Sequence, residues 1–145
     1  MKKINGKYYD LDPAKQVAEY WNGLDSKDPN YCKEILYKSD EEGYLLYGEH
    51  GNEFDLTTSA GEFTMSGEEV LSDLYGEAMG WLDFHDNWDI IEKELIDRAH
   101  NEQRTFSINE LKGHFNRFMD EFINLHPEYF DDRPSNERHH KKKEN

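Results

Sequence analysis

Carboxylates are the residues of this sequence whose number and spacing could do chemistry. Between Glu62 and Glu102 the chain has twelve Asp or Glu residues, against Lys93 and Arg98 within the stretch and Arg104 just beyond it. Trp, Leu and Ile residues are interleaved with these acids, so the stretch is expected to fold rather than to remain disordered. A folded surface with so many carboxylates repels nucleic acid and attracts proteins that hold nucleic acid.

Eight of these carboxylates recur at helical spacings and are predicted to bind a partner. Like charges on neighbouring turns of a helix cost stability unless a partner compensates them. The alternative for any single residue is a solvated surface that keeps the protein soluble. The predicted partner-binding residues are Glu68, Glu69, Asp73, Glu77, Asp83, Asp86, Asp89 and Glu94.

The same residue types would serve a metal-dependent nuclease, which gathers carboxylates with a His or Lys around a divalent ion. The local candidates are the Glu49-His50 pair near Glu53 and Asp55, followed by His85-Asp86. Neither cluster has a recognised metal-ligand spacing. The sequence therefore predicts no catalytic residue, no metal site and no cofactor.

The remaining polar candidates have structural interpretations. The single cysteine, Cys32, excludes an intramolecular disulfide and a multi-cysteine zinc motif, and is predicted to be a small buried residue in a strand. His114 is expected at the boundary of an apolar helical stripe. The segment Gly48-x-x-Gly51 lacks the Lys-Ser/Thr sequel of a phosphate-binding loop.

The first half of the chain is predicted to form a small sheet and one helix. An Asn5-Gly6 turn indicates a short strand or hairpin. Asp12-Pro13 is typical of a helix start, and the apolar spacing predicts a helix over residues 13–24. Aromatic and β-branched residues predict strands over 31–38 and 43–49, joined by an acidic turn, and 62–65 is a candidate third strand.

Three helices are predicted in the second half. Ser66 and Glu69 have capping-box spacing, which predicts a helix that reaches Leu82. A second helix is predicted over 87–101. A third, opened by a capping box of Ser107 with Glu110, has a heptad-like apolar stripe over 108–125. This stripe could be core, or it could be a homodimer face made of Phe115, Phe118 and Phe122.

Composition limits the size of the protein, and the predicted elements set the fold class. The chain has 145 residues, of which 35% are hydrophobic and 14% aromatic, and its net charge is −15, which fits one domain with a modest core. The strands and helices predicted above indicate an α+β protein: a small antiparallel sheet packed by helices, with an α-helical C-terminal extension. The predicted parts are an α+β domain over 1–104, a helical extension over 105–130 and a disordered tail over 131–145. No signal peptide or membrane span is visible, so a cytoplasmic protein is expected.

Two stretches resemble a known family. They read INGKYYDLDPAKQVAEYWNG and YCKEILYKSDEEGYLLYGEHG, and a Ser-x-Glu-Glu segment that leads to Trp81 follows them. Together they resemble a small domain of proteins from mobile elements of Gram-positive bacteria and their phages, over about residues 1–100. His50 interrupts the usual Gly-Gly of that pattern. Some proteins similar to this domain inhibit type II CRISPR systems.

The resemblance and the acidic surface together imply an anti-CRISPR inhibitor from a bacterial mobile element. Its expected partner is a basic nucleic-acid-binding protein, a CRISPR effector nuclease, whose guide RNA or target DNA it displaces by mimicking nucleic acid. Direct binding of nucleic acid is disfavoured by the charge. The alternatives are a metal-dependent nuclease that cuts guide RNA and a non-enzymatic, dimeric interaction protein of a conjugative element.

Overall fold

The structure is a computed structural model that describes residues 1–39, 43–72, 75–103, 105–112, 115 and 119–131. Two compact units are present, one over Met1–Asn87 and the other over Trp88–Asn145, and each is described by itself. This division falls after Asn87, whereas the sequence suggested a domain boundary after residue 104. None of the helices in the described ranges has the length and apolar character that a membrane span needs.

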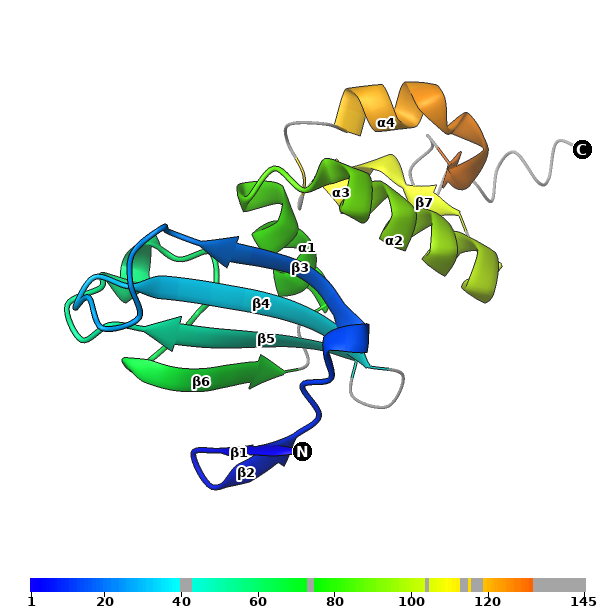
Figure 1. Cartoon of the computed structure of the whole chain (residues 1–145). Coiled ribbons are helices and arrows are strands. Elements are labelled where there is room, and N and C mark those ends of the chain that lie inside the picture. The colour runs from blue at the N-terminus through cyan, green and yellow to red at the C-terminus, as the bar shows by residue number, and fades with distance from the viewer. Residues whose placement is uncertain (40–42, 73–74, 104, 113–114, 116–118, 132–145) are drawn as a thin grey trace, which may run out of the picture. The chain divides into compact units, whose positions relative to one another are not determined.

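The first unit is built on a four-stranded antiparallel sheet (Figure 1). Its strands are β3 (Gln16–Trp21), β4 (Cys32–Ser39), β5 (Gly43–His50) and β6 (Gly67–Ser72), and their order in the sheet follows their order in the chain. The central pair, β4 and β5, confirms the two strands predicted over 31–38 and 43–49. The α+β class is thereby confirmed as well.

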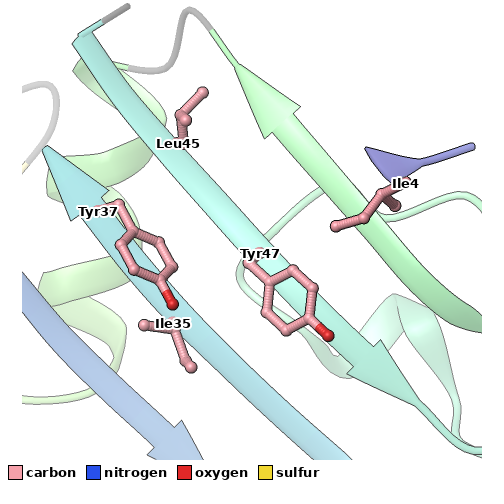
Figure 2. Packing of buried hydrophobic residues seen from close by; sticks show 5 residues of the cluster. All are labelled: Ile4, Ile35, Tyr37, Leu45 and Tyr47. Atoms are coloured by element: carbon pink, nitrogen blue, oxygen red, sulfur yellow. The ribbon is translucent and has the colours of Figure 1, made fainter. Parts of the chain in front are cut away.

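Both faces of the central strands are covered, which explains their nearly continuous apolar sequence. A short hairpin, β1 (Lys2–Ile4) with β2 (Lys7–Tyr9), supplies Ile4 to one face. Figure 2 shows this face, where Ile4 joins Ile35, Tyr37, Leu45 and Tyr47. Helix α1 (Tyr75–Phe84) covers the other face, buries Trp81 and Leu82 completely and contacts β5.

The helix predicted over residues 13–24 is wrong. A 3-10 turn, η1 (Pro13–Lys15), is capped by Asp12 as expected, but the chain then enters strand β3. The register between β3 and β4 shifts between Gln16 and Ala18, so one extra residue interrupts the strand alternation. The interrupted alternation has the three- and four-residue apolar steps of a helix, so the sequence pattern by itself favours a helix here.

The helix predicted from Ser66 is also corrected. Residues Gly67–Ser72 are strand β6, and α1 begins only at Tyr75. Glu69 does not cap a helix: its carboxylate accepts hydrogen bonds from the Thr64 and Met65 amides at 2.8 and 3.1 Å. These bonds hold residues 62–65 as a loop, so the candidate strand there is wrong.

The second unit is mainly helical. It contains α2 (Trp88–Glu102), α3 (Ile108–Lys112), α4 (Met119–Leu125) and the turn η3 (Pro127–Tyr129), with a parallel pair of two-residue strands, β7 (Phe106–Ser107) and β8 (Phe130–Asp131). Helix α2 confirms the helix predicted over 87–101. The single helix predicted over 108–125 is instead represented by α3 and α4. The predicted disordered tail lies outside the described residues except for Asp131.

Candidate functional site

The eight carboxylates predicted to bind a partner do not form one helical row. Glu68 and Glu69 lie on β6, Glu77 and Asp83 on α1, Asp86 just after α1, and Asp89 and Glu94 on α2. Glu69 and Glu94 are buried, Asp83 is half-buried, and Asp73 lies outside the described residues. The exposed members are Glu68, Glu77, Asp86 and Asp89.

Sheet register brings a further carboxylate next to Glu68. Glu49 on β5 pairs directly with Glu68 on β6, so both side chains lie on the same face of the sheet. The Tyr47 hydroxyl donates to Glu68 Oε2 at 2.5 Å and also contacts Glu49. A phenol has one proton to donate, so the two carboxylates compete for it.

A lysine and a second tyrosine contact the Glu49–Glu68 carboxylate pair. The Lys2 ammonium lies 2.5 Å from Glu68 Oε2 and 5.3 Å from the centre of the Tyr47 ring. The hydrogen bonds from Lys2 and Tyr47 hold the pKa of Glu68 below its usual value. Tyr31 donates to Glu49 Oε1 at 3.2 Å, and burial together with the Glu49 charge raises the pKa of Tyr31 to about 12.

Two adjoining hollows open beside this pair, with volumes of about 400 and about 290 Å³. They share Ser26 and Tyr31, and we call them together the acidic groove. Its walls are Glu19, Trp21, Leu24, Asp25, Ser26, Tyr31 and Lys33 in the larger hollow, and Glu49, His50, Gly51, Gly67 and Glu68 with the shared residues in the smaller.

The acidic groove has the chemistry of a cation-binding surface. Four carboxylates line it against one lysine, Lys33, whose Nζ lies 3.7 Å from Glu19 Oε1. Trp21 is 55% exposed at its wall, although it is a large aromatic residue. Carboxylates and aromatic rings together bind ammonium and guanidinium groups, through ion pairs and through attraction of the cation to the ring face.

A second polar cluster is buried on the opposite face of the sheet, below α1. The Glu34 carboxylate, 1% exposed, lies 2.7 Å from His50 Nε2 and accepts hydrogen bonds from Trp81 Nε1 at 2.9 Å and Ser59 Oγ at 2.8 Å. The Cys32 thiol donates to it at 3.4 Å. Burial alone would raise the pKa of Glu34, but these hydrogen bonds outweigh it and lower the pKa.

Cys32 is buried in a strand, as predicted. Burial, with the nearby Glu34 charge, raises the pKa of its thiol, so at neutral pH the thiol is protonated and is a poor nucleophile. Cys32, Glu34 and His50 are side chains of the types that bind metal ions. Their ligand atoms all lie within 4.8 Å of one another, and they form the one such group of three in the described part of the chain.

The nuclease candidates do not come together. His50 faces the buried cluster, whereas its neighbour Glu49 faces the acidic groove, because consecutive residues of a strand point to opposite faces. Asp55 caps the 3-10 turn η2 (Leu56–Thr58) through the Thr57 amide at 3.0 Å, and Glu53 is exposed.

The two side chains of the second nuclease candidate, His85-Asp86, also lie in different environments. The His85 ring stacks on Tyr20 with centroids 4.2 Å apart, and burial lowers the pKa of His85. Asp86 is exposed, in a left-handed backbone conformation with φ of 58°.

The predicted dimer face falls largely in the interior. Phe115 and Phe122 are each 1% exposed, and Phe122 makes an edge contact with Phe130 at 5.4 Å between ring centroids. Phe118 and His114 lie outside the described residues. Burial of these two rings favours the core interpretation of the stripe.

Sequence reasoning missed Glu34 and Trp81 as site residues. A signal was present, because Cys32 and Glu34 are two residues apart and therefore share a face of β4. The register between β4 and β5 places His50 opposite Cys32. Trp81 had no such signal, since its hydrogen bond to Glu34 joins residues 47 positions apart.

Comparison of the chain with protein-family models, with curated proteins and with solved structures gave no match.

Proposed function

We propose that this protein is a non-enzymatic inhibitor that binds a basic, nucleic-acid-binding protein. The observation that carries the proposal is the charge of the first unit. Residues 1–87 contain seven Lys and no Arg against nineteen Asp and Glu, a net charge of −12 out of −15 for the whole chain. Such a field accelerates encounter with a basic surface and opposes encounter with nucleic acid.

The distribution along the chain strengthens this proposal. No Lys or Arg occurs between Lys38 and Lys93, a stretch that contains fifteen Asp or Glu residues. Exposed carboxylates of this stretch include Glu68 on β6 and Glu77 on α1. An ordinary soluble domain intersperses charges of both signs, whereas here the lysines that meet the acidic surface, such as Lys2 at Glu68, come from other parts of the chain.

The acidic groove is the concave part of this surface. A lysine or arginine side chain of the partner would enter it, pair with Glu49 or Glu68 and lie against Trp21 or Tyr31. The partner that this charge pattern and the resemblance of the sequence favour is a type II RNA-guided effector nuclease. Its Lys- and Arg-lined channel for guide RNA or target DNA is the complementary surface.

The test is to incubate the purified protein with a type II effector and labelled guide RNA, following complex formation and RNA length in one gel. Loss of the loaded complex with intact RNA is the expected result. Shortened RNA would replace the proposal with guide-RNA cleavage. If neither complex nor RNA changes, and target DNA binding is unaffected too, the effector is not the partner.

A matched pair of variants locates the interface. Glu49→Gln with Glu68→Gln removes two charges from the acidic groove, and Gln can still accept from Tyr47. Glu121→Gln with Glu128→Gln removes two exposed charges from the second unit. We expect the groove variant to inhibit more weakly and the control to inhibit normally. Equal weakening would mean that total charge matters and the groove does not.

A further inference from the structure

We infer that Cys32, Glu34 and His50 form a zinc-binding site in the interior of the first unit. His50 also lines the acidic groove, but its side chain is 0% exposed and points, with Cys32 and Glu34, to the face of the sheet opposite to Glu49 and Glu68. This inference is therefore independent of the proposed function. A thiolate, an imidazole and a carboxylate are the three side-chain ligand types that Zn²⁺ takes in proteins.

Strand register positions the three donors before any ligand binds. Cys32 and Glu34 alternate along β4, and His50 pairs directly with Cys32 across the β4–β5 ladder. They are the two central strands of the sheet, so each pairs with a neighbour on both sides. The Cys32 Sγ and His50 Nε2 atoms lie 3.4 and 2.7 Å from the same carboxylate oxygen, Glu34 Oε2. Two atoms that bind the same zinc ion lie slightly farther apart than two hydrogen-bonded atoms. His50 Nε2 and Glu34 Oε2 would therefore have to separate slightly to bind Zn²⁺.

The orientation of His50 selects its Nε2 as the ligand. The ring lies against Phe54 and Phe63, with centroids 5.3 and 4.5 Å away, and its Nδ1 has no hydrogen-bond partner within the described part of the chain. A neutral imidazole bound through Nε2 carries its proton on Nδ1.

The hydrogen-bond donors around Glu34 would orient its carboxylate, as the hydrogen-bond partners of metal-binding side chains do. Trp81 Nε1 donates to Oε1, and the Ser59 hydroxyl donates to Oε2 at 2.8 Å, next to the three proposed ligand atoms. Partners of this kind fix ligating side chains and strengthen metal binding.

Charge balance in a buried place is compatible with the ion. Glu34 and His50 are 1% and 3% exposed, so a net charge there is costly. One Zn²⁺ with a thiolate, a carboxylate and a neutral imidazole has no net charge. Binding breaks the S–H bond of Cys32 and releases that proton to solvent, so uptake must weaken as the pH falls.

The first test uses the wild-type protein with cobalt(II) as the probe. The chain is unfolded in denaturant with a chelator, freed of both, and refolded with one equivalent of Co²⁺. Cys32 is the single cysteine, so a thiolate-to-cobalt absorption band can only come from this site. We expect that band, its loss on addition of Zn²⁺, and a higher midpoint of thermal unfolding with Zn²⁺ than with chelator. A wild-type protein without the band, or without the shift, would overturn the site.

Variants then identify the other ligands. His50→Gln and Glu34→Gln should each weaken cobalt binding by at least about tenfold, and Ser59→Ala by about tenfold. Glu49→Gln is the matched control, since it neighbours His50 in sequence but faces the acidic groove, and should keep the full band. If His50→Gln and Glu34→Gln fold and keep wild-type affinity, the thiol binds the metal without them and the proposed site is wrong.

Discussion

The indole Nε1 of Trp81 donates a hydrogen bond of 2.9 Å to the carboxylate of Glu34, and both side chains are almost completely buried. The bond joins α1 to β4, two elements that strand β5, the segment over residues 51–66 and strand β6 separate in sequence. A buried carboxylate is tolerated only when donors surround it, so the position of α1 over the sheet and the ionisation of Glu34 depend on each other.

Removing this donor should destabilise the first unit. Trp81→Phe keeps a large aromatic ring but leaves Glu34 Oε1 without the indole proton, and we expect a loss of about 1–3 kcal/mol in the free energy of unfolding. Urea denaturation followed by circular dichroism measures it. Trp21→Phe is the matched control: Trp21 donates to the Leu24 carbonyl at an exposed site, and its replacement should cost within about 0.5 kcal/mol. Equal losses in the two variants would contradict this account.

His85 should make stability depend on pH in the mildly acidic range. Burial lowers its pKa below 6.5, so the unfolded chain binds the proton more readily than the folded one. The stability that the neutral ring permits is therefore complete above pH 6.5 and is lost as the pH falls below that value, with a slope of at most about 1.4 kcal/mol per pH unit.

His85→Phe tests this pH dependence because it keeps an aromatic ring that can stack on Tyr20. Urea unfolding of both proteins between pH 7.5 and pH 5 (about the range where histidine titrates) gives the comparison. We expect the variant to lose less stability than the wild type over this range. Identical pH profiles would mean that His85 protonates equally well in the folded and unfolded chain.

Two glycines should respond oppositely to alanine. A Cβ at Gly51 would lie 2.3 Å from the Pro29 carbonyl oxygen, a backbone atom that also accepts from the Glu53 amide. Gly51→Ala should therefore cost about 1–3 kcal/mol of stability. At Gly80, inside α1, a Cβ meets nothing within 4 Å, and Gly80→Ala should stabilise by about 0.5–1 kcal/mol. Thermal unfolding midpoints decide both, and a stabilising Gly51→Ala would refute the close approach.

Binding to a type II effector should depend strongly on salt. The proposed contact joins opposite charges near the surface, and such contacts are screened over about 8 Å at physiological ionic strength. Stopped-flow association should slow as salt rises, with a shallower dependence for the Glu49→Gln, Glu68→Gln double variant than for the wild type. An association rate that ignores salt would indicate an apolar interface instead.

Strands β4 and β5 and helix α2 could be predicted because their signals are local. The two strands of the hairpin are rich in aromatic and aliphatic residues, and α2 has one apolar stripe with Ile91 and Leu95 buried. Strands β3 and β6 could not be predicted in the same way. Both are edge strands, whose structure comes from pairing with β4 and β5 rather than from their own propensity.

The acidic character of the site could be predicted from the sequence, but the identity of the carboxylates that form it could not. Composition established that carboxylates dominate the first unit. Glu69 and Glu94 were predicted among the partner-binding residues, yet both are buried, and Glu69 is tied to the Thr64–Met65 backbone. Glu49 was considered only as a nuclease residue, and its place beside Glu68 follows from the β5–β6 register.

The sequence by itself determined the α+β class, the central hairpin, the burial of Cys32 and the excess negative charge, because composition, local propensity and short-range periodicity are properties of neighbouring residues. The tertiary structure alone decided which carboxylates meet. It placed Glu49 with Glu68 on one face of the sheet, and Glu34 with His50 and Trp81 on the other. The physical reason is that hydrogen bonds between strands and to α1 join residues far apart in the chain, and one step along a strand reverses the face to which a side chain points.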